Sequence, residues 1–139
     1  MRLSARNQIK GVISSVELGA VNAIVKLDFA GERISGTISI AAVKELGLEP
    51  GKEAYAVIKA TEVMIGLGEL TLSARNKFAG EIVSVDEGAV NGIVKIAIAG
   101  GNVMSATISM NAIRELELVP GKQAVAVVKA TSVMFGVDD

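Results

Sequence analysis

The chain has 139 residues, of which 50% are hydrophobic, and its 14 Lys and Arg against 15 Asp and Glu give a formal charge of −1. It contains no His, Cys or Trp, which excludes zinc sites, iron–sulfur clusters, a haem histidine and Cys- or His-based catalysis. The balanced charge and the 3% aromatic content argue against nucleic-acid and membrane partners, because counterion release needs a basic surface and exposed bases need stacking partners.

The N-terminal segment and the overall hydropathy pattern bear on location. The first eight residues hold two Arg and no apolar core of a signal peptide. No later stretch approaches the roughly 18 uninterrupted apolar residues of a membrane span. We therefore expect a soluble, cytoplasmic protein.

Five segments of the first half have the two-residue alternation typical of β-strands. In the second of them, every odd-numbered residue from Val21 to Phe29 is apolar, while Asn22, Lys26 and Asp28 occupy the other face. Such a pattern predicts a half-buried strand, with Val21 on the buried side. The five predicted strands cover residues 11–16, 21–29, 33–38, 53–59 and 63–65.

One segment between the third and fourth strands has helical spacing instead. Residues 40–46 place apolar side chains one turn apart, with Ser39 in the N-cap position and Gly47 where the helix should end. Five short strands interrupted by one helix are the element order of a small OB-type barrel.

The whole pattern occurs twice. Residues 3–7 return unchanged as residues 72–76, and residues 50–52 return as residues 120–122 after one inserted residue near Gly101. We predict an all-β protein of two tandem OB-type five-stranded barrels, each with one short helix, over residues 1–68 and 69–139. A domain this small hides only about 60% of its unfolded surface, so we expect the copies to pack together and the chain to oligomerise.

Several polar residues recur at the same place in both copies. Ser4 and Arg6 stand just before a predicted strand, and Lys59 ends an apolar run. Each has a structural alternative: a polar turn for the first two, and for Lys59 a lysine that extends to solvent or guards a sheet edge. Ser39 is first of all a helix cap, although a helix start also favours anions. Gly19 and Asn22 are explained by a turn that opens the next strand. The alternative is a second anion pocket, formed by exposed N–H groups and Asn22 where several chains meet.

Together these residues supply hydrogen-bond donors and positive charge without a repeated carboxylate. Glu49, Glu53 and Glu62 have no acidic residue at the equivalent positions of the second copy. A donor-only set suits a tetrahedral dianion, whose oxygens accept many hydrogen bonds. The same set lacks a general base, an activated nucleophile and the ligands of a metal cation. We therefore expect a binding protein and not an enzyme, with no cofactor.

The recurring motifs closely resemble the Mop domain of molbindins, a family of small molybdate-binding proteins of the cytoplasm. The resemblance covers the chain twice and implies a tandem, two-domain molbindin for molybdate storage and homeostasis. It further implies a homotrimer, equivalent to six single domains, with molybdate or tungstate held at the interfaces as the oxyanion, without a metal–protein bond. The residues that the resemblance assigns to oxyanion binding are Ser4, Ala5, Arg6, Asn7, Ser39, Lys59, Ala60 and Thr61, with Ser73, Ala74, Arg75, Asn76, Ser109, Lys129, Ala130 and Thr131 in the second copy.

The resemblance also implies a second class of oxyanion site near the threefold axis, and the sequence departs from the family in two respects. Ala42 and Ala112 stand where some relatives have a hydroxyl, and Glu117 replaces the helix-ending Gly47. Neither change removes the recurrent cations. The segments assigned to the second-class site are Gly19, Ala20, Val21 and Asn22, and Gly88, Ala89, Val90 and Asn91.

Two other functions remain open from the sequence. OB-type barrels often bind oligonucleotides, although the composition argues against this here. The same domain also resembles the ligand-sensing tail of molybdate-responsive regulators and of transporter ATPase subunits. This resemblance implies, as an alternative, a molybdate-sensing module that acts on a transporter or on a cofactor-synthesis partner.

Overall fold

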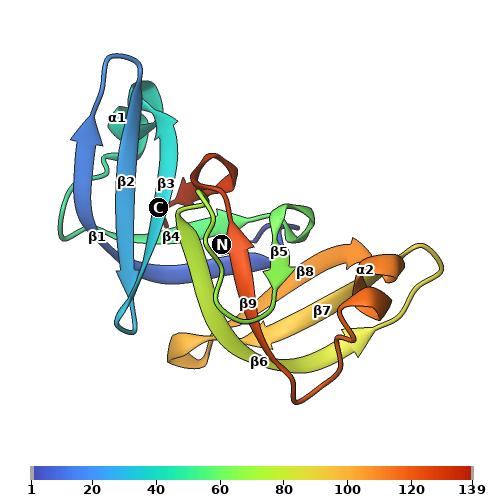
Figure 1. Ribbon diagram of the computed structural model, residues 1–139. Coiled ribbons are helices and arrows are strands. Elements are labelled where there is room, and N and C mark those ends of the chain that lie inside the picture. Colours follow the sequence, from blue (N-terminus) through green and yellow to red (C-terminus); the bar gives the residue numbers. More distant parts are fainter. Residues whose placement is uncertain (1, 139) are drawn as a thin grey trace.

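The computed structural model describes residues 2–138 and contains two five-stranded antiparallel sheets, each accompanied by one short α-helix (Figure 1). This confirms the predicted fold class. No helix among the described residues is long and apolar enough to cross a membrane. The first repeat contains β1 (Asn7–Leu18), β2 (Asn22–Phe29), β3 (Glu32–Ser39), α1 (Ile40–Leu46), β4 (Glu53–Ile58), the 3-10 turn η1 (Ala60–Glu62) and β5 (Met64–Gly66). The second contains β6 (Asn76–Asp86), β7 (Asn91–Ala97), η2 (Ala99–Gly101), β8 (Val103–Ser109), α2 (Met110–Glu115), β9 (Gln123–Val128), η3 (Ala130–Ser132) and β10 (Met134–Gly136).

The two repeats exchange their last strands. The sheet orders are β10-β4-β1-β2-β3 and β5-β9-β6-β7-β8, so the C-terminal strand completes the sheet of the first repeat (Figure 1). Phe135 pairs with Ala56, and its counterpart Ile65 pairs with Ala126. The copies are therefore interlocked and not merely adjacent. Each sheet therefore contains one strand from across the boundary that the sequence predicts at residue 68.

A large side chain packs against a small residue where each exchanged strand meets the opposite repeat. The ring of Phe135 lies directly over Gly36, and a Cβ atom at position 36 would collide with it. At the equivalent positions of the second sheet the residues are Ile65, from β5, and Ala106, from β8. In the interior, Phe29 and Phe78 meet edge to face with ring centroids 5.7 Å apart, which joins both repeats in one hydrophobic core.

Strand β1 is longer than the sequence predicted. It begins at Asn7 and not at Gly11, and its two halves serve different partners: β4 along the first half and β2 along the second, with a bulge between Ile13 and Ser15. A bulge bends a strand and increases its twist. Polar residues at the start of β1 hide its two-residue alternation in the sequence.

The predicted place of Val21 on the buried face of β2 was wrong. This side chain is 73% exposed and precedes β2, which begins at Asn22. A turn closed by the Gly19 N–H, which donates to the Asn22 carbonyl (2.8 Å), turns Val21 outward, and the Val21 carbonyl accepts a hydrogen bond from the Ile40 N–H (3.0 Å). Residues 23, 25, 27 and 29 are buried as predicted.

Helix α1 begins and ends where the sequence predicted. The Ser39 hydroxyl accepts from the Ala42 N–H, and Gly47 adopts the left-handed conformation with φ 62°. In the second repeat Glu117 occupies the same left-handed turn with φ 52°. This conformation costs a residue with a side chain about 1–2 kcal/mol, which Gly avoids.

We therefore expect Glu117→Gly to raise the free energy of unfolding by about 1 kcal/mol, since the strain relieved exceeds the extra chain entropy of Gly. Urea unfolding followed by circular dichroism measures the change. The reverse substitution, Gly47→Glu, should lower stability by a similar amount. A lower stability of Glu117→Gly would contradict this account of the turn.

Candidate functional site

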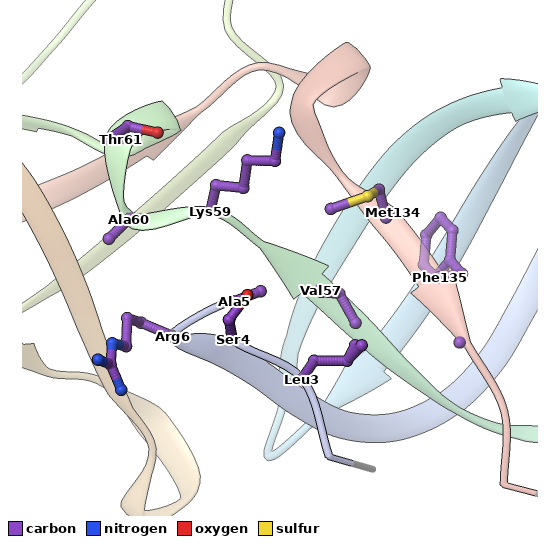
Figure 2. A pocket seen from close by; sticks show the side chains of 11 residues that line it. Leu3, Ser4, Ala5, Arg6, Val57, Lys59, Ala60, Thr61, Met134 and Phe135 are labelled. Atoms are coloured by element: carbon purple, nitrogen blue, oxygen red, sulfur yellow. The ribbon is translucent and has the colours of Figure 1, made fainter.

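The polar residues of the first repeat meet in one pocket of about 520 Å³, which we call pocket I (Figure 2). Two chain segments form its polar side: residues 4–6 before β1 and residues 59–61 after β4. The sheet places them together, because Asn7 and Ile58 are the last paired residues at this end of the β1–β4 ladder. Six predicted site residues line the pocket: Ser4, Ala5, Arg6, Lys59, Ala60 and Thr61.

The second repeat builds the same arrangement, pocket II, with a volume of about 400 Å³. Here Asn76 and Val128 are the last paired residues of the β6–β9 ladder. The segment before β6 and the segment after β9 therefore leave the sheet at the same end. The predicted residues that line pocket II are Ser73, Ala74, Arg75, Lys129, Ala130 and Thr131. The structure thus brings six of the eight predicted residues of each repeat together in one pocket.

Apolar residues that the sequence analysis did not single out form the rest of each wall. Leu3 and Met134 line pocket I, and their counterparts Leu72 and Met64 line pocket II. Met134 reaches pocket I because β10 crosses over to the first sheet, which the sequence pattern did not reveal. The signal available in the sequence is that both Leu and both Met recur at equivalent positions. The other wall residues of pocket I are Val57, Phe135 and Gly136.

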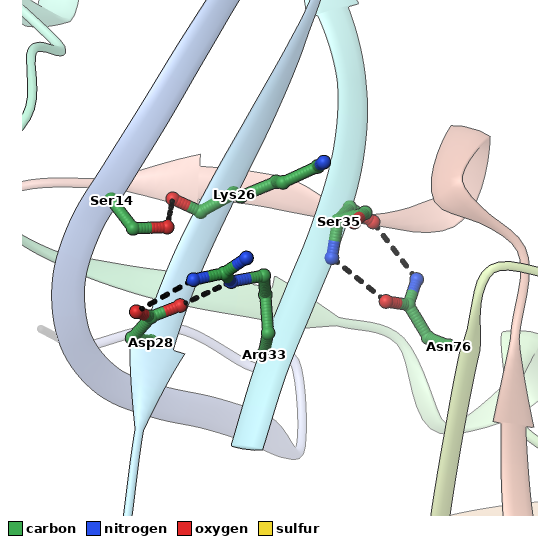
Figure 3. A network of polar contacts seen from close by, with 6 residues as sticks. All are labelled: Ser14, Lys26, Asp28, Arg33, Ser35 and Asn76. Carbon is green, nitrogen blue, oxygen red and sulfur yellow. Dashed lines mark hydrogen bonds and ion pairs between the residues drawn. The ribbon is translucent and has the colours of Figure 1, made fainter. Parts of the chain in front are cut away.

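The pocket cations are unpaired within the described part of the chain. Arg33, by contrast, forms a two-pronged ion pair with Asp28 (Nε–Oδ1 2.7 Å; Figure 3), and this hydrogen bond holds the pKa of the Asp28 carboxyl below its usual value. Lys10 lies 3.6 Å from the Glu53 carboxylate. No Asp or Glu lines pocket I or pocket II among residues 2–138. The charge that remains available is that of Arg6, Lys59, Arg75 and Lys129.

Pocket I is open on the side of its two cationic residues. Figure 2 shows the Lys59 and Arg6 side chains leaving the rim in different directions, with Ser4 and Ala5 between them. Both cationic side chains are exposed. The two cationic side chains therefore do not close over pocket I within a single chain.

The predicted Asn residues lie elsewhere. Asn7 and Asn76 are both 1% exposed and neither lines pocket I or pocket II. The Asn7 side chain hydrogen-bonds the backbone of Ser105, and the Asn76 side chain hydrogen-bonds the backbone of Ser35. Their amide groups are directed into the contact between the two repeats.

Ser39 and Ser109 also lie outside the two pockets. Each caps a helix through its hydroxyl, and each is paired across the sheet with the Asn of the predicted second-class segment: Ser39 with Asn22, and Ser109 with Asn91. The structure thus groups the capping serines with residues 19–22 and 88–91.

The predicted second-class segment of the first repeat borders a separate pocket of about 340 Å³. Gly19 and Asn22 line it, as does Glu17, whose carboxylate opposes an anion. Ala20 and Val21 do not line this pocket, and both are exposed. The equivalent residues Gly88, Ala89, Val90 and Asn91 are likewise exposed.

Exposed apolar residues recur in pairs. Val21 and Val90 are 73% and 75% exposed, and Ile24 and Ile93 are both 39% exposed. Leu3 and Leu72, and Met64 and Met134, are also exposed at equivalent positions. Other exposed apolar residues, such as Leu18, have a polar counterpart. The recurring exposed apolar residues therefore occupy equivalent positions in the two repeats.

Residues 2–138 contain no set of ligands for a metal cation. No group of three or more His, Cys, Asp or Glu is close enough to hold a metal ion. What the two pockets offer is hydroxyls, backbone N–H groups, ammonium and guanidinium. These groups bind anions.

Comparison with known proteins identifies relatives along the whole chain. The TOBE domain family matches residues 3–65 and again residues 72–135. The molybdenum transport protein ModE of Herbaspirillum seropedicae is 39% identical over 140 residues, which cover 99% of this chain and 52% of ModE. A probable molybdenum-pterin-binding protein of Haemophilus influenzae is 62% identical over 68 residues, which cover 48% of this chain and 99% of that protein. The chain therefore spans about half the length of ModE.

The structural comparison extends over both repeats. The crystal structure of the cytoplasmic molybdate-binding protein ModG with molybdate bound superimposes with a TM-score of 0.96 and 38% sequence identity. The match covers 99% of this chain and 100% of the ModG chain. One superposition therefore covers both repeats of this chain together.

Proposed function

The chain belongs to the TOBE domain family, and we propose that it binds molybdate, and tungstate as its near-isostere, as intact oxyanions in pockets I and II. The proposed activity is binding and not catalysis. The proposed role of the protein is to store intracellular molybdate in the cytoplasm and to keep the supply of molybdate constant.

The observation that carries this proposal is the duplication of one donor set. Pocket I and pocket II each combine an Arg, a Lys, a Ser, a Thr and two short backbone segments, and no carboxylate among the described residues lines either of them. Two positive charges balance one dianion, and the hydroxyl and amide donors satisfy its oxygens. The likeness to molybdate-bound ModG over the whole chain points to the same class of ligand.

We further propose that the working form is a homotrimer, in which the two domains of each chain give six. The open rim of each pocket, with exposed Leu3 and Met134 beside pocket I, needs cover before an anion is shielded from water. The exposed pairs Val21 with Val90 and Ile24 with Ile93 are suited to supply this contact from a neighbouring copy. In that arrangement Ser39 and Ser109 approach the pockets from the next chain, and residues 19–22 and 88–91 line second-class sites.

Native mass spectrometry during a molybdate titration tests ligand and assembly together. The expected species is a trimer of three 14.3 kDa chains, which takes up six molybdates in pockets I and II before any further ion. Elemental analysis of molybdenum after equilibrium dialysis checks the count in solution.

Sulfate at the same concentration serves as the control for nonspecific anion binding. Molybdenum retention no greater than that of a neutral control protein would end the proposal of an oxyanion carrier. A monomer that still binds two molybdates would contradict the trimer alone. Binding of single-stranded RNA in place of molybdate would favour the oligonucleotide alternative.

A further inference from the structure

Asn7 and Asn76 each bind the edge strand of the opposite repeat. The Asn76 carboxamide oxygen accepts from the Ser35 N–H (2.8 Å), and its NH₂ group donates to the Ser35 carbonyl (2.8 Å; Figure 3). Asn7 does the same at Ser105, with distances of 2.7 and 2.9 Å. A side-chain amide here forms the two hydrogen bonds that a neighbouring strand would form to an edge residue.

These two residues also stand at the base of the pockets. Asn7 is opposite Ile58 in the β1–β4 ladder. Arg6 directly precedes Asn7 in the chain, and Lys59 directly follows Ile58. Asn76 stands in the same way between Arg75 and Lys129, and its NH₂ group also contacts the Val128 carbonyl (3.2 Å). Each Asn thus belongs to the last residue pair of its ladder, after which both polar segments of its pocket leave the sheet.

We propose that Asn7 and Asn76 are positioning residues: each fixes the two donor segments of its own pocket by docking their common base onto the edge strand of the other repeat. This inference rests on the proposed function, since it concerns how the oxyanion donors are held. It differs from the assignment of these residues as ligands, because their amides face the inter-repeat contact and not the pocket. Pocket I therefore depends on β8, and pocket II on β3.

The test uses each pocket in isolation. Lys129→Met leaves pocket I as the intact site and Lys59→Met leaves pocket II. In the first background Asn7→Asp should weaken molybdate binding at pH 8 about tenfold, because the variant loses the hydrogen bond to the Ser105 carbonyl and buries a charge beside it. In the second background Asn7→Asp should change the affinity less than about twofold. Asn76→Asp should give the opposite pattern.

A pH series distinguishes positioning from general destabilisation. Burial and the Ser105 carbonyl raise the pKa of a carboxyl introduced at position 7. Once protonated, that carboxyl donates an O–H to the same carbonyl and restores the bond, so molybdate affinity relative to the wild type should recover as the pH falls from 8 to 5.5. Asn7→Ala should show the same pocket-selective loss without the recovery, and it also serves if the Asp variant does not fold.

Gln123→Glu is the matched control, because it makes the same amide-to-acid change at an exposed site where the first repeat already has Glu53. It should leave both affinities unchanged. Equal losses in both pockets, or no loss in either, would overturn the inference while wild-type binding kept the proposed function. A wild type that retains no molybdate would remove the proposed function, and this inference with it.

Discussion

Replacing Lys59 and Lys129 together by Met is expected to weaken molybdate binding by about 2–5 kcal/mol at each pocket, because a charged contact to a desolvated dianion is lost. This corresponds to roughly 30-fold to several thousand-fold in Kd. The lower end of the range applies if water still reaches the ammonium group when the ion is bound. Isothermal titration calorimetry measures the change.

The stability of the double variant should hardly change, since both Lys side chains are exposed and make no ion pair with the described residues. Lys26→Met with Lys95→Met is the matched control. These lysines occupy equivalent positions on β2 and β7, they line neither pocket, and their removal changes the net charge equally. Equal weakening in both doubles would mean that the overall charge, and not the pocket lysines, attracts the anion.

Phe135→Ala should lower the free energy of unfolding by about 3–5 kcal/mol, the usual cost of removing a buried aromatic side chain. The ring is 9% exposed and lies over Gly36, where its loss leaves a cavity and loosens β10. Because β10 completes the first sheet, the transition should remain a single cooperative step. Urea unfolding monitored by circular dichroism gives both the midpoint and the slope.

Met134→Ala is the neighbouring control, since Met134 is 43% exposed and surface substitutions usually change stability by less than about 0.5 kcal/mol. A sharper check combines Phe135→Ile with Gly36→Ala, which copies the Ile65 and Ala106 pair of the second sheet. The double variant should be more stable than Phe135→Ile alone. An additive loss would show that the large residue and the small residue are not complementary.

The recurrent polar residues were predictable because the duplication provides an internal comparison. Six of the eight residues predicted for the first-repeat pocket lie together in pocket I, from Ser4 to Thr61. The capping role of Ser39 and the limits of α1 also followed from local rules, since caps and left-handed turns depend on a few adjacent residues.

The strand exchange and its effects on the site could not be predicted from local patterns. Residues 63–65 and 133–135 have the pattern of an edge strand in either sheet. The alternation of their side chains therefore does not indicate with which sheet they pair. For the same reason the sequence did not place Met134 at pocket I. The buried amides of Asn7 and Asn76 were equally hidden, because a polar residue next to Arg6 or Arg75 is typical of a ligand-binding turn. Only the opposite edge strand reveals their partner.

The exchange of β5 and β10 also determines how the two halves depend on each other. Cutting the chain between the repeats would leave two fragments with four-stranded sheets, each carrying a fifth strand shaped for the other. Such fragments would have to find each other by diffusion, whereas the covalent joint keeps each strand at a high local concentration beside its acceptor. Tandem duplication thus makes completion of the two sheets independent of protein concentration.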